Sequence, residues 1–359
     1  MEPKSPLGHF LRDVWPLLIL TAVLLVIVIL IQSIGDRIIS QSLTEALIRL
    51  SVVVGLYIFI GNSGLISFGH IGFMMIGAYM TAWLTMDPMT KDIFIPGLPE
   101  FIETAQLSGF WYEWVAATVI GGLLAAVVAF ISGLALMRLS GIAASIGTFA
   151  LFMSFYSFYL QWSTWTAGQS SLVGIPVTTT PWVALGFALA AMLGAFVYSR
   201  SRFGLALRAS REDEVAAKAA GVNVFFQRVI AFTISAVFVG MAGGLYGHFL
   251  GLLTVDTFYL PLTFITLSML VVGGMQSLSG AVIGTIALSF IIEFLRAFEK
   301  GFKFGDVTVG LPASSAEVGL GVVLLLILIF RPTGLTRNAE IYWPWKGRVQ
   351  MSSVTRRQS

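Results

Sequence analysis

The chain of 359 residues contains no cysteine and few charged residues, and both absences narrow what it can be. Without cysteine it can form no disulfide, no thiolate nucleophile and no cysteine-ligated metal site. Charged residues make up only 11% of the chain, whereas hydrophobic residues make up 57%. Soluble domains carry about 25% charged residues, so this composition indicates an integral membrane protein. A nucleic-acid partner is not expected, because no soluble module carries a basic face.

Long apolar runs supply ten candidate membrane spans, since a helix needs about 20 mostly apolar residues to cross the hydrocarbon core of a bilayer. They lie near 15–34, 43–60, 62–86, 111–137, 141–160, 181–199, 225–249, 260–273, 281–295 and 314–330. We therefore expect an all-α, polytopic fold, with about ten transmembrane helices in a single membrane-spanning domain over residues 1–359. Segment 272–284, "VGGMQSLSGAVIG", has no charge to mark it as a loop and could instead be a re-entrant element.

Basic residues predict which ends of the spans face the cytoplasm, because Lys and Arg accumulate in cytoplasmic loops. They gather in segments 200–228 and 331–357, which four candidate spans separate. An even number of spans allows both segments to be cytoplasmic. This arrangement predicts a short cytoplasmic N-terminus at 1–14 and a cytoplasmic tail at 331–359. Loop 87–110, which is net acidic, then faces outward.

The most compact charged stretch is "RASREDEVAAKAAGVN", residues 208–223. Ser210 is a candidate helix cap with Asp213 three residues later. Glu214 and Lys218 are spaced for an ion pair one helical turn apart, and Gly221 is a natural helix stop. One face of this predicted helix carries small residues that another protein could approach closely: Val215, Ala216, Ala219 and Ala220. A solvated loop helix without a partner is the alternative.

Glycines interrupt the start of the third apolar run, and a similar segment occurs at 273–280 in the other half of the chain. In membrane proteins, non-helical backbone is tolerated only where protein or a water-filled cavity surrounds it, and such pairs often line a substrate path. The predicted path residues are Gly61, Gly64, Ser67, Gly69, His70, Gly273, Gly274 and Ser277. Close helix packing is the alternative for the glycines, as it is for the rows of small residues at 121–133 and 243–251. For the histidine, the alternative is a neutral imidazole bonded between helices.

The charged stretch and its lead-in, "RSRFGLALRAS", resemble the coupling loop of LivM-type permeases, which belong to branched-chain amino acid ABC importers. Ala216, Ala217 and Gly221 keep the Ala-Ala-x-x-x-Gly spacing of the importer EAA motif. Glu214 departs from that motif, because it stands one position early. Three further segments are similar to elements of this family and occur in its order: "GNSGLISFGHIGFMMIGAY", "VVGGMQSLSGAVIG" and "FRPTGL". Together they extend the resemblance over essentially the whole chain.

The resemblance implies a multi-pass permease subunit of the bacterial inner membrane that transports branched-chain or related hydrophobic amino acids. It implies a LivH-like second permease, two cytoplasmic ABC ATPases and a periplasmic substrate-binding protein as partners, besides membrane lipid. The coupling loop would span about 200–224, and the residues that would couple it to an ATPase are Arg208, Glu212, Glu214, Ala216, Ala217 and Gly221. No catalytic residue, cofactor or metal is expected, since separate subunits would hydrolyse ATP. Urea permeases, or those of another small polar solute, are the nearest alternative.

An ion-coupled secondary carrier is an alternative from a different functional class. Such carriers usually need carboxylates near the middle of the membrane. The acidic residues within the apolar runs instead map near the predicted outer ends of their spans: Glu45, Glu113, Glu293 and Glu317. The chain also lacks a G-x-x-x-x-G-K-[ST] phosphate loop, so an external ATPase is the expected energy source. An intramembrane enzyme is not favoured, because no H-E-x-x-H motif is present.

Overall fold

We describe a computed structural model that covers residues 6–107, 111–300, 302–304, 307–309, 315–331 and 333–340. Within these residues, eight helical segments are long and apolar enough to cross a membrane. The helices concerned are α1 (Pro6–Ile34), α2 (Arg37–Ser63), α6 (Trp111–Leu136), α7 (Gly141–Gln161), α9 (Pro181–Arg200), α12 (Val224–Leu250), α13 (Leu260–Gly273), which the 3₁₀ helix η1 (Val255–Phe258) precedes, and α14 (Leu278–Lys300).

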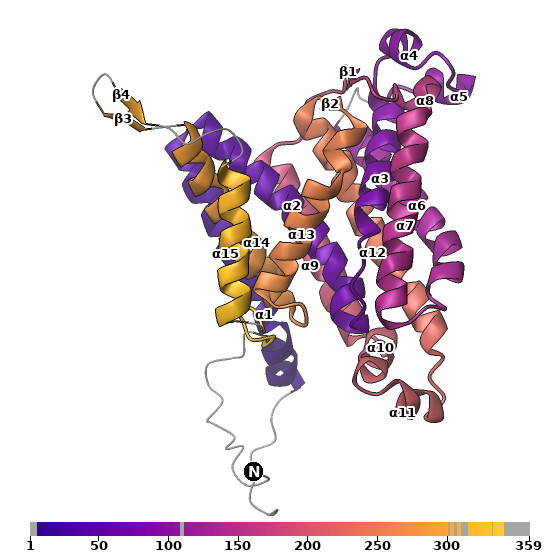
Figure 1. Cartoon of the computed structure of the whole chain (residues 1–359), viewed down its shortest axis with the longest axis vertical. Coiled ribbons are helices and arrows are strands. Elements are labelled where there is room, and N and C mark those ends of the chain that lie inside the picture. The colour runs from indigo at the N-terminus through magenta and orange to yellow at the C-terminus, as the bar shows by residue number, and fades with distance from the viewer. Residues whose placement is uncertain are drawn as a thin grey trace, which may run out of the picture.

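Two shorter helices, α3 (His70–Thr85) and α15 (Ser315–Phe330), occupy the remaining two apolar runs (Figure 1). The prediction of an all-α polytopic membrane protein is therefore confirmed. The third run differs from a continuous span, because α2 extends to Ser63 and residues 64–69 are not helical. We call residues 64–69 the α2–α3 break. In segment 272–284, a tight turn at 274–277 joins α13 directly to α14.

Short elements lie at the two ends of the helical bundle (Figure 1). One end carries α4 (Pro88–Phe94), α5 (Glu100–Glu103), α8 (Ser163–Thr166) and two small antiparallel pairs, β1 (Leu172–Val173) with β2 (Leu252–Leu253) and β3 (Phe302–Phe304) with β4 (Val307–Val309). The other end carries α10 (Arg202–Glu212) and α11 (Glu214–Ala219). The start of α1 and the end of α15 also lie at the α10–α11 end, as the predicted parity of spans requires (Figure 1). The remainder of the predicted termini, residues 1–5 and 341–359, lies outside the described residues.

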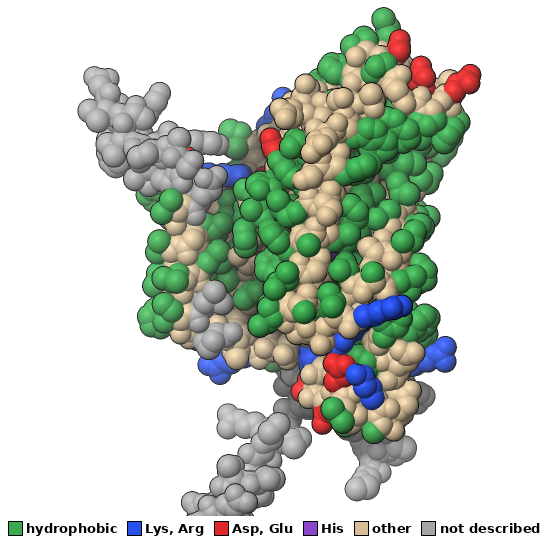
Figure 2. Space-filling view, turned by 45° about the vertical axis from the view of Figure 1, so that its right-hand side comes forward, with side chains coloured by type: hydrophobic (Ala, Val, Ile, Leu, Met, Phe, Trp, Pro, Cys, Tyr) green, Lys and Arg blue, Asp and Glu red, His purple; other side chains and the backbone are tan. Residues whose placement is uncertain are grey.

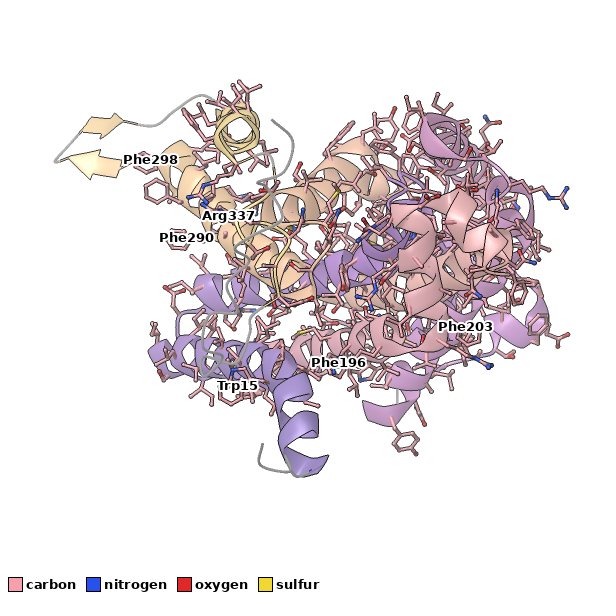
Figure 3. The ribbon with its side chains drawn as sticks, turned by 90° about the horizontal axis from the view of Figure 1, so that it is seen from below. Trp15, Phe196, Phe203, Phe290, Phe298 and Arg337 are labelled. Carbon is pink, nitrogen blue, oxygen red and sulfur yellow. The ribbon has the colours of Figure 1, made fainter. Side chains whose placement is uncertain are left out.

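The surface has the distribution of side chains that a bilayer demands. Hydrophobic side chains cover the middle of the face in Figure 2, while acidic side chains gather at the α4–α5 end and mixed charges gather around α10 and α11. Seen along the bundle in Figure 3, Phe290 and Phe298 of α14 lie at its periphery, and Phe290 is 72% exposed. Exposed aromatic side chains at these positions are suited to contact with lipid.

Helix α2 forms the centre of the bundle. Of the residues in its most apolar stretch, 89% are buried, compared with 17% for α1. It packs against α9, α12 and α14. Asp36 caps its start by accepting a hydrogen bond from the backbone N–H of Ile38 at 2.7 Å. Gly64 ends it with a φ of 72°, a left-handed conformation that glycine adopts without steric cost.

Glycines set the contact between α3, α6 and α12. A Cβ atom on Gly243 would lie 1.9 Å from the carbonyl oxygen of Met74, and one on Gly121 would lie 2.7 Å from that of Gly77. Backbones can approach this closely only where no side chain intervenes. The packing interpretation is therefore confirmed for these two positions. Gly251, at the end of its row, has a different role, since it ends α12 with a φ of 73°.

Buried Lys91 holds together the loop that carries α4 and α5. Its Nζ donates hydrogen bonds to the carbonyl oxygens of Ile102, Glu103 and Ala105. Burial lowers the pKa of this amine to about 8, although the neighbouring Asp87 and Glu103 partly oppose the shift. The amine therefore cross-links α4 to the end of α5 and gives this short loop a defined shape.

Candidate functional site

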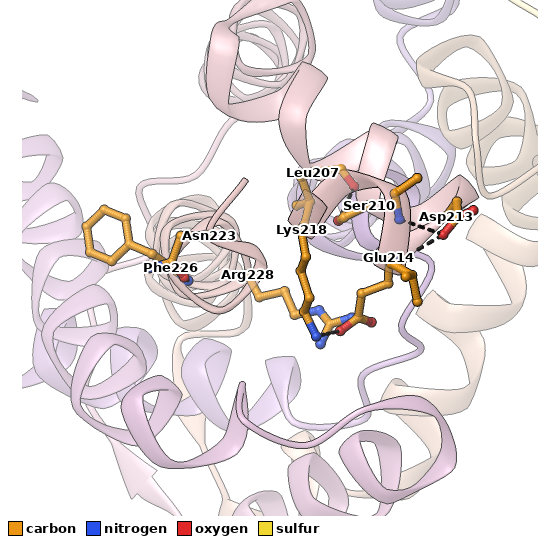
Figure 4. A network of polar contacts seen from close by, with 10 residues as sticks. Leu207, Ser210, Asp213, Glu214, Lys218, Asn223, Phe226 and Arg228 are labelled. Atoms are coloured by element: carbon orange, nitrogen blue, oxygen red, sulfur yellow. Dashed lines mark hydrogen bonds and ion pairs between the residues drawn. The ribbon is translucent and has the colours of Figure 1, made fainter. Parts of the chain in front are cut away.

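The predicted coupling loop folds as two short helices rather than one. The hydroxyl of Ser201 accepts a hydrogen bond from the N–H of Gly204 and caps α10. Asp213 caps α11, because its carboxylate accepts hydrogen bonds from the N–H groups of Val215 and Ala216, both at 2.9 Å (Figure 4). The prediction that Ser210 is the cap is wrong. Its hydroxyl instead donates to the carbonyl of Leu207 within α10, and the helical path breaks at Asp213, a strong N-cap residue.

Helix α11 ends at the predicted stop. Gly221 has a φ of 84°, its N–H donates to the carbonyl of Lys218, and the N–H of Val222 donates to that of Ala217, both at 3.0 Å. These two bonds form a Schellman motif, which satisfies the last carbonyls of a helix. The prediction that Gly221 terminates the helix is therefore confirmed.

The small-residue face of α11 is open to its surroundings. Val215 is 79% exposed, and Ala216, Ala219 and Ala220 are also exposed. Ala217, the second alanine of the EAA-like spacing, points the other way and is 6% exposed. The prediction that this face is accessible is confirmed, and Ala217 anchors the helix to the rest of the molecule.

An ion-pair network joins α11 to the membrane-spanning helix α12. The carboxylate of Glu214 lies 2.8 Å from Nζ of Lys218 and 2.7 Å from Nη2 of Arg228, whose side chain is only 8% exposed (Figure 4). The predicted pair one turn apart is thereby confirmed, and Arg228 is an additional partner. Hydrogen bonds from Lys218 and Arg228 hold the pKa of the Glu214 carboxyl below its ordinary value, despite some opposing desolvation.

Two arginines join α10 to the ends of other spanning helices. Arg208 donates to the carbonyl oxygen of Ser199, at the end of α9. Nη1 of Arg211 donates to the carbonyl oxygen of Gly61, in the last turn of α2, at 2.6 Å. The sequence predicts that Arg208 couples the loop to an ATPase, whereas here it bonds α9 within the same chain. It does not predict a role for Arg211. The only available signal was that cations favour helix C-termini, which does not identify the helix concerned.

Residues 61–70 are held by hydrogen bonds to their neighbours. The hydroxyl of Ser145 on α7 donates to the carbonyl of Ile66 at 2.7 Å, and the N–H of Phe68 donates to Oγ1 of Thr148 at 3.3 Å. A Cβ on Gly69 would lie 2.8 Å from the carbonyl oxygen of Thr148. The α2–α3 break therefore lies directly against α7.

His70 begins α3 and is 1% exposed. Its Nδ1 lies 2.8 Å from Oγ of Ser67, and its ring is surrounded by Phe59, Phe73 and Phe232 with centroid distances of 5.1–6.0 Å. In the described part of the chain, Nε2 has no hydrogen-bond partner. Enclosure by three phenylalanine rings favours a structural role for this imidazole, but its hydrogen bond is to Ser67, three residues earlier, and does not join two helices as the alternative had it.

The second glycine-rich segment forms a tightly packed turn. A Cβ on Gly273 would lie 1.9 Å from the carbonyl oxygen of Gly280, so α13 and α14 touch through their backbones. Gly274 has a φ of 120°, and the hydroxyl of Ser277 accepts a hydrogen bond from the N–H of Gly280 at 2.9 Å. These contacts favour close packing as the reason for glycine at 273 and 280.

The chain that follows α15 folds back onto this turn. The N–H of Leu335 donates to the carbonyl of Val272 at 2.7 Å. The carboxylate of Glu340 accepts hydrogen bonds from the N–H groups of Leu278 and Ser279, at 2.7 and 3.1 Å, and from the hydroxyl of Ser279 at 2.6 Å. Glu340 thus supplies the N-terminal cap of α14 from a distant part of the sequence.

The two glycine-rich segments meet at the α10–α11 end of the bundle. A Cβ on Gly61 would lie 2.6 Å from the carbonyl oxygen of Met275, in the α13–α14 turn. Beside this contact lies an apolar pocket of about 270 Å³. Its lining includes Ile66, Phe68, Phe264, Leu267 and Met275.

A second apolar pocket of about 360 Å³ shares Phe68 and Phe264 with the first and extends to α7 at Ile146 and Phe149. We call the two together the break pockets. Among the described residues, none of the eight predicted path residues lines either one. They lie behind or beside apolar neighbours that sequence reasoning missed, because an apolar pocket residue has the same sequence signal as a lipid-facing one.

Comparison with known proteins identifies the architecture. The model of a family described as a branched-chain amino acid transport system permease component matches residues 38–330. The chain belongs to this permease family. It is similar to the permease protein LivM of Escherichia coli K12, with 26% identity over 326 residues that cover 81% of this chain and 68% of the relative. No solved structure matches the chain significantly.

Other relatives are the permease protein LivH of Escherichia coli K12 and the permease protein BraD of Pseudomonas aeruginosa. LivH is 32% identical over 180 residues, 49% of this chain and 54% of LivH. BraD is 29% identical over 175 residues, 48% of this chain and 53% of BraD. The resemblance to the LivM family is therefore confirmed, and the chain is a multi-pass membrane permease. Matches to both LivM and LivH indicate a transport system with two permeases.

Proposed function

We propose that the chain is the permease subunit of a binding-protein-dependent ABC importer and moves branched-chain or related hydrophobic amino acids across the bacterial inner membrane. It pairs with a LivH-like permease, binds two cytoplasmic ATPases and receives substrate from a periplasmic binding protein. The chain itself hydrolyses no ATP. The α10–α11 end faces the cytoplasm, together with both termini. The observation that carries the proposal is the α10–α11 segment, which presents an exposed small-residue face and is bonded to three spanning helices.

The exposed face of α11 is the part that docks to the ATPase. Val215 is an apolar side chain that is 79% exposed, and it lies between the charged residues Glu214 and Lys218. Small residues around it allow a partner's backbone to approach closely, and Glu212 and Lys218 supply charge at the rim. A compact apolar centre with a polar rim is the usual composition of a protein interface.

The translocation path runs along the face that α7, α13 and the α2–α3 break share, where the second permease closes it. The break pockets are lined by aliphatic and aromatic side chains, with Ser145 and Ser268 as their polar residues. Such a lining suits an aliphatic side chain better than urea, which needs hydrogen-bonding groups. The eight predicted path residues line neither pocket, and their role in this proposal is to pack behind the apolar residues that do.

The outer acidic residues favour an ATP-driven importer over an ion-coupled carrier. Glu45 pairs with Arg49 on the next turn and lies 3.6 Å from Arg296. Glu293 lies 3.2 Å from the same arginine. Carboxylates that are neutralised by arginines are poor candidates for sites that must bind and release protons or sodium ions.

The decisive experiment is to tag Ser359, extract the protein gently from its native membrane and identify the proteins that co-purify by mass spectrometry. We expect an ATPase and a second permease. Gly221→Pro, or reversal of charge at Glu212 and Glu214, should abolish ATPase co-purification while membrane insertion persists, because proline cannot adopt the positive φ at 221. Asp92→Lys, an exposed charge reversal at the opposite end, is the matched control.

Two results would contradict the proposal. A chain that purifies alone and still transports in vesicles without ATP would restore the ion-coupled carrier. A tag at Ser359 that is labelled from outside intact cells would reverse the proposed orientation.

A further inference from the structure

We propose that Arg211 is the link that carries ATPase docking into the membrane domain, where it repositions the end of α2 and thereby gates the inner end of the transport path. This inference rests on the proposed function, because it presupposes that α10 and α11 bind an ATPase. It assigns the transmission step to one side chain, whose contacts differ from those of every neighbouring arginine on α10.

The first observation is how Arg211 holds the end of α2. The last four carbonyls of a helix lack intrahelical donors. The N–H of Leu65, which would bond the carbonyl of Gly61 in a longer helix, instead donates to the hydroxyl of Ser63 at 3.2 Å. Nη1 of Arg211 takes its place at 2.6 Å and complements the negative end of the helix dipole. The helix therefore ends against a residue of the coupling segment.

The second observation is the packing of the Arg211 stem. A Cβ on Gly64 would lie 2.8 Å from Cγ of Arg211, so the side chain lies directly across the left-handed residue at which α2 stops. The Arg211 side chain is only 17% exposed. A rotation of α10 therefore bears directly on the Gly61–Gly64 segment through this side chain.

The third observation is the second partner of the same guanidinium. Nη2 and Nε of Arg211 donate to the carboxylate of Glu212, at 2.6 and 3.1 Å. The Glu212 side chain is 73% exposed and lies at the rim of the docking face. One rigid guanidinium thus joins a carboxylate that a partner can reach to a carbonyl that it cannot reach. A partner that takes the Glu212 carboxylate changes the position of the guanidinium and its bond to Gly61.

The fourth observation is what lies beyond Gly61. A Cβ on Gly61 would lie 2.6 Å from the carbonyl oxygen of Met275, and Met275 and Ile66 both line the first break pocket. Displacement of the end of α2 therefore changes the shape of the pocket directly, because Gly61 contacts a residue that lines it. Discrete rearrangements of hydrogen-bonded elements of this kind are a common basis of coupled motion.

The experiment compares Arg211→Gln and Arg211→Lys with Arg202→Gln in the complete importer, reconstituted in liposomes. Arg202 lies on the same helix, and its guanidinium lies over the ring of Phe203. We expect Arg211→Gln to retain the ATPase and its basal hydrolysis, to lose stimulation by substrate-loaded binding protein, and to transport at least tenfold more slowly. Arg211→Lys, which keeps the charge but lacks the planar guanidinium that bonds both partners from separate nitrogens, should be intermediate. Arg202→Gln should match the wild type.

A second measurement reports on the gate itself. Because the chain has no cysteine, Ile66→Cys gives a unique thiol at a position that is 39% exposed. Its labelling by a membrane-impermeant maleimide should differ between nucleotide-free and vanadate-trapped complexes. With Arg211→Gln added, that difference should disappear. A structural role alone would change the labelling level but not its dependence on nucleotide.

Three outcomes separate this proposal from the proposed function. Normal coupled transport in Arg211→Gln would overturn the assignment of Arg211. Loss of ATPase co-purification in Arg211→Gln alone would also overturn it, because the residue would then be part of the dock. Failure of the wild-type chain to bind any ATPase would overturn the proposed function itself.

Discussion

The two glycine-rich segments meet at Gly61 and Met275, yet they are built in different ways. In the α13–α14 turn, glycine backbones are in direct contact, and a Cβ on Gly284 would lie 2.1 Å from the carbonyl oxygen of Met269. In the α2–α3 break, the backbone is irregular, and single hydrogen bonds from Ser145 and to Thr148 hold it to α7. A hydrogen bond can be exchanged at little net cost, whereas close packing cannot be altered in small steps.

The two segments also differ in what lies against them. Residues 333–340, which follow the last spanning helix, cover the α13–α14 turn, and Glu340 caps α14 there. The α2–α3 break begins where the side chain of Arg211 from the coupling segment lies. Similar glycine content thus accompanies two mechanical roles. We infer that the turn is the fixed base and that the break is the part that moves.

The largest effect should come from adding a side chain to the fixed base. In Gly273→Val, the Cβ would overlap the carbonyl oxygen of Gly280 at 1.9 Å, and backbone atoms cannot move aside as a side chain can. We expect a loss of at least about 3 kcal/mol of folding free energy, since overpacking usually costs 1–3 kcal/mol even where side chains can adjust. The yield of monodisperse protein after detergent extraction should fall accordingly.

Gly186→Val is the matched control, because nothing lies within 4 Å of a Cβ at that exposed helical position. Equal yields for the two valine variants would show that the α13–α14 contact is not the fixed base that we infer.

A smaller loss should follow Glu340→Ala, which removes the acceptor for three hydrogen bonds at the start of α14. Loss of a helix N-cap typically costs about 1–2 kcal/mol. We expect a lower Tm in detergent, with Glu340→Gln intermediate because it keeps one carbonyl oxygen. An unchanged Tm in Glu340→Ala would mean that segment 333–340 does not stabilise the turn.

The sequence predicts the membrane-spanning helices well because their signal is local. Each apolar run contains a helix, but α2 extends beyond the predicted 43–60 at both ends. At its start, Arg37, Ser40, Gln41 and Ser42 lower the hydropathy before residue 43 although they lie within the helix. Glu45 and Arg49, which lie inside the predicted run, compensate each other as an ion pair. At its other end, Ser63 is followed by a break that the glycine content suggested without giving its limits.

The candidate site likewise has features that local spacing predicts and features that only packing determines. The Glu214–Lys218 pair and the Gly221 stop depend only on spacing, so they could be predicted. Arg211 could not be, because its acceptor Gly61 lies 150 positions away in the sequence and becomes a neighbour only through packing. The Ser210 cap failed because a competing cap, Asp213, lies three residues later and divides the helix.

A third prediction tests the mobility of the break. Thr148→Val keeps the shape of the side chain but removes the acceptor for the N–H of Phe68, which should cost about 1 kcal/mol. We expect stronger maleimide labelling of Ile66→Cys, because one of the bonds that hold the break to α7 is lost. Thr233→Val is the control, since that hydroxyl bonds only within α12. Equal labelling in the two valine variants would contradict a break that moves when its hydrogen bonds are lost.

The smallest effect should come from Glu214→Gln, because glutamine keeps one acceptor oxygen for the buried Arg228 and loses the charge and the second oxygen, which the exposed Lys218 contacts. Exposed pairs one turn apart contribute about 0.3–0.5 kcal/mol. The pKa of Glu214 is lowered in the folded state, so its contribution is complete above the unfolded pKa of about 4.3 and is lost only as the pH falls through the lower folded value. The difference in Tm between wild type and Glu214→Gln should therefore be constant from pH 5 to pH 8. A difference that grows or vanishes within that range would mean that Glu214 is not held ionised by Lys218 and Arg228. The contact between α11 and α12 would then have to rest on the packing of Ala217 instead.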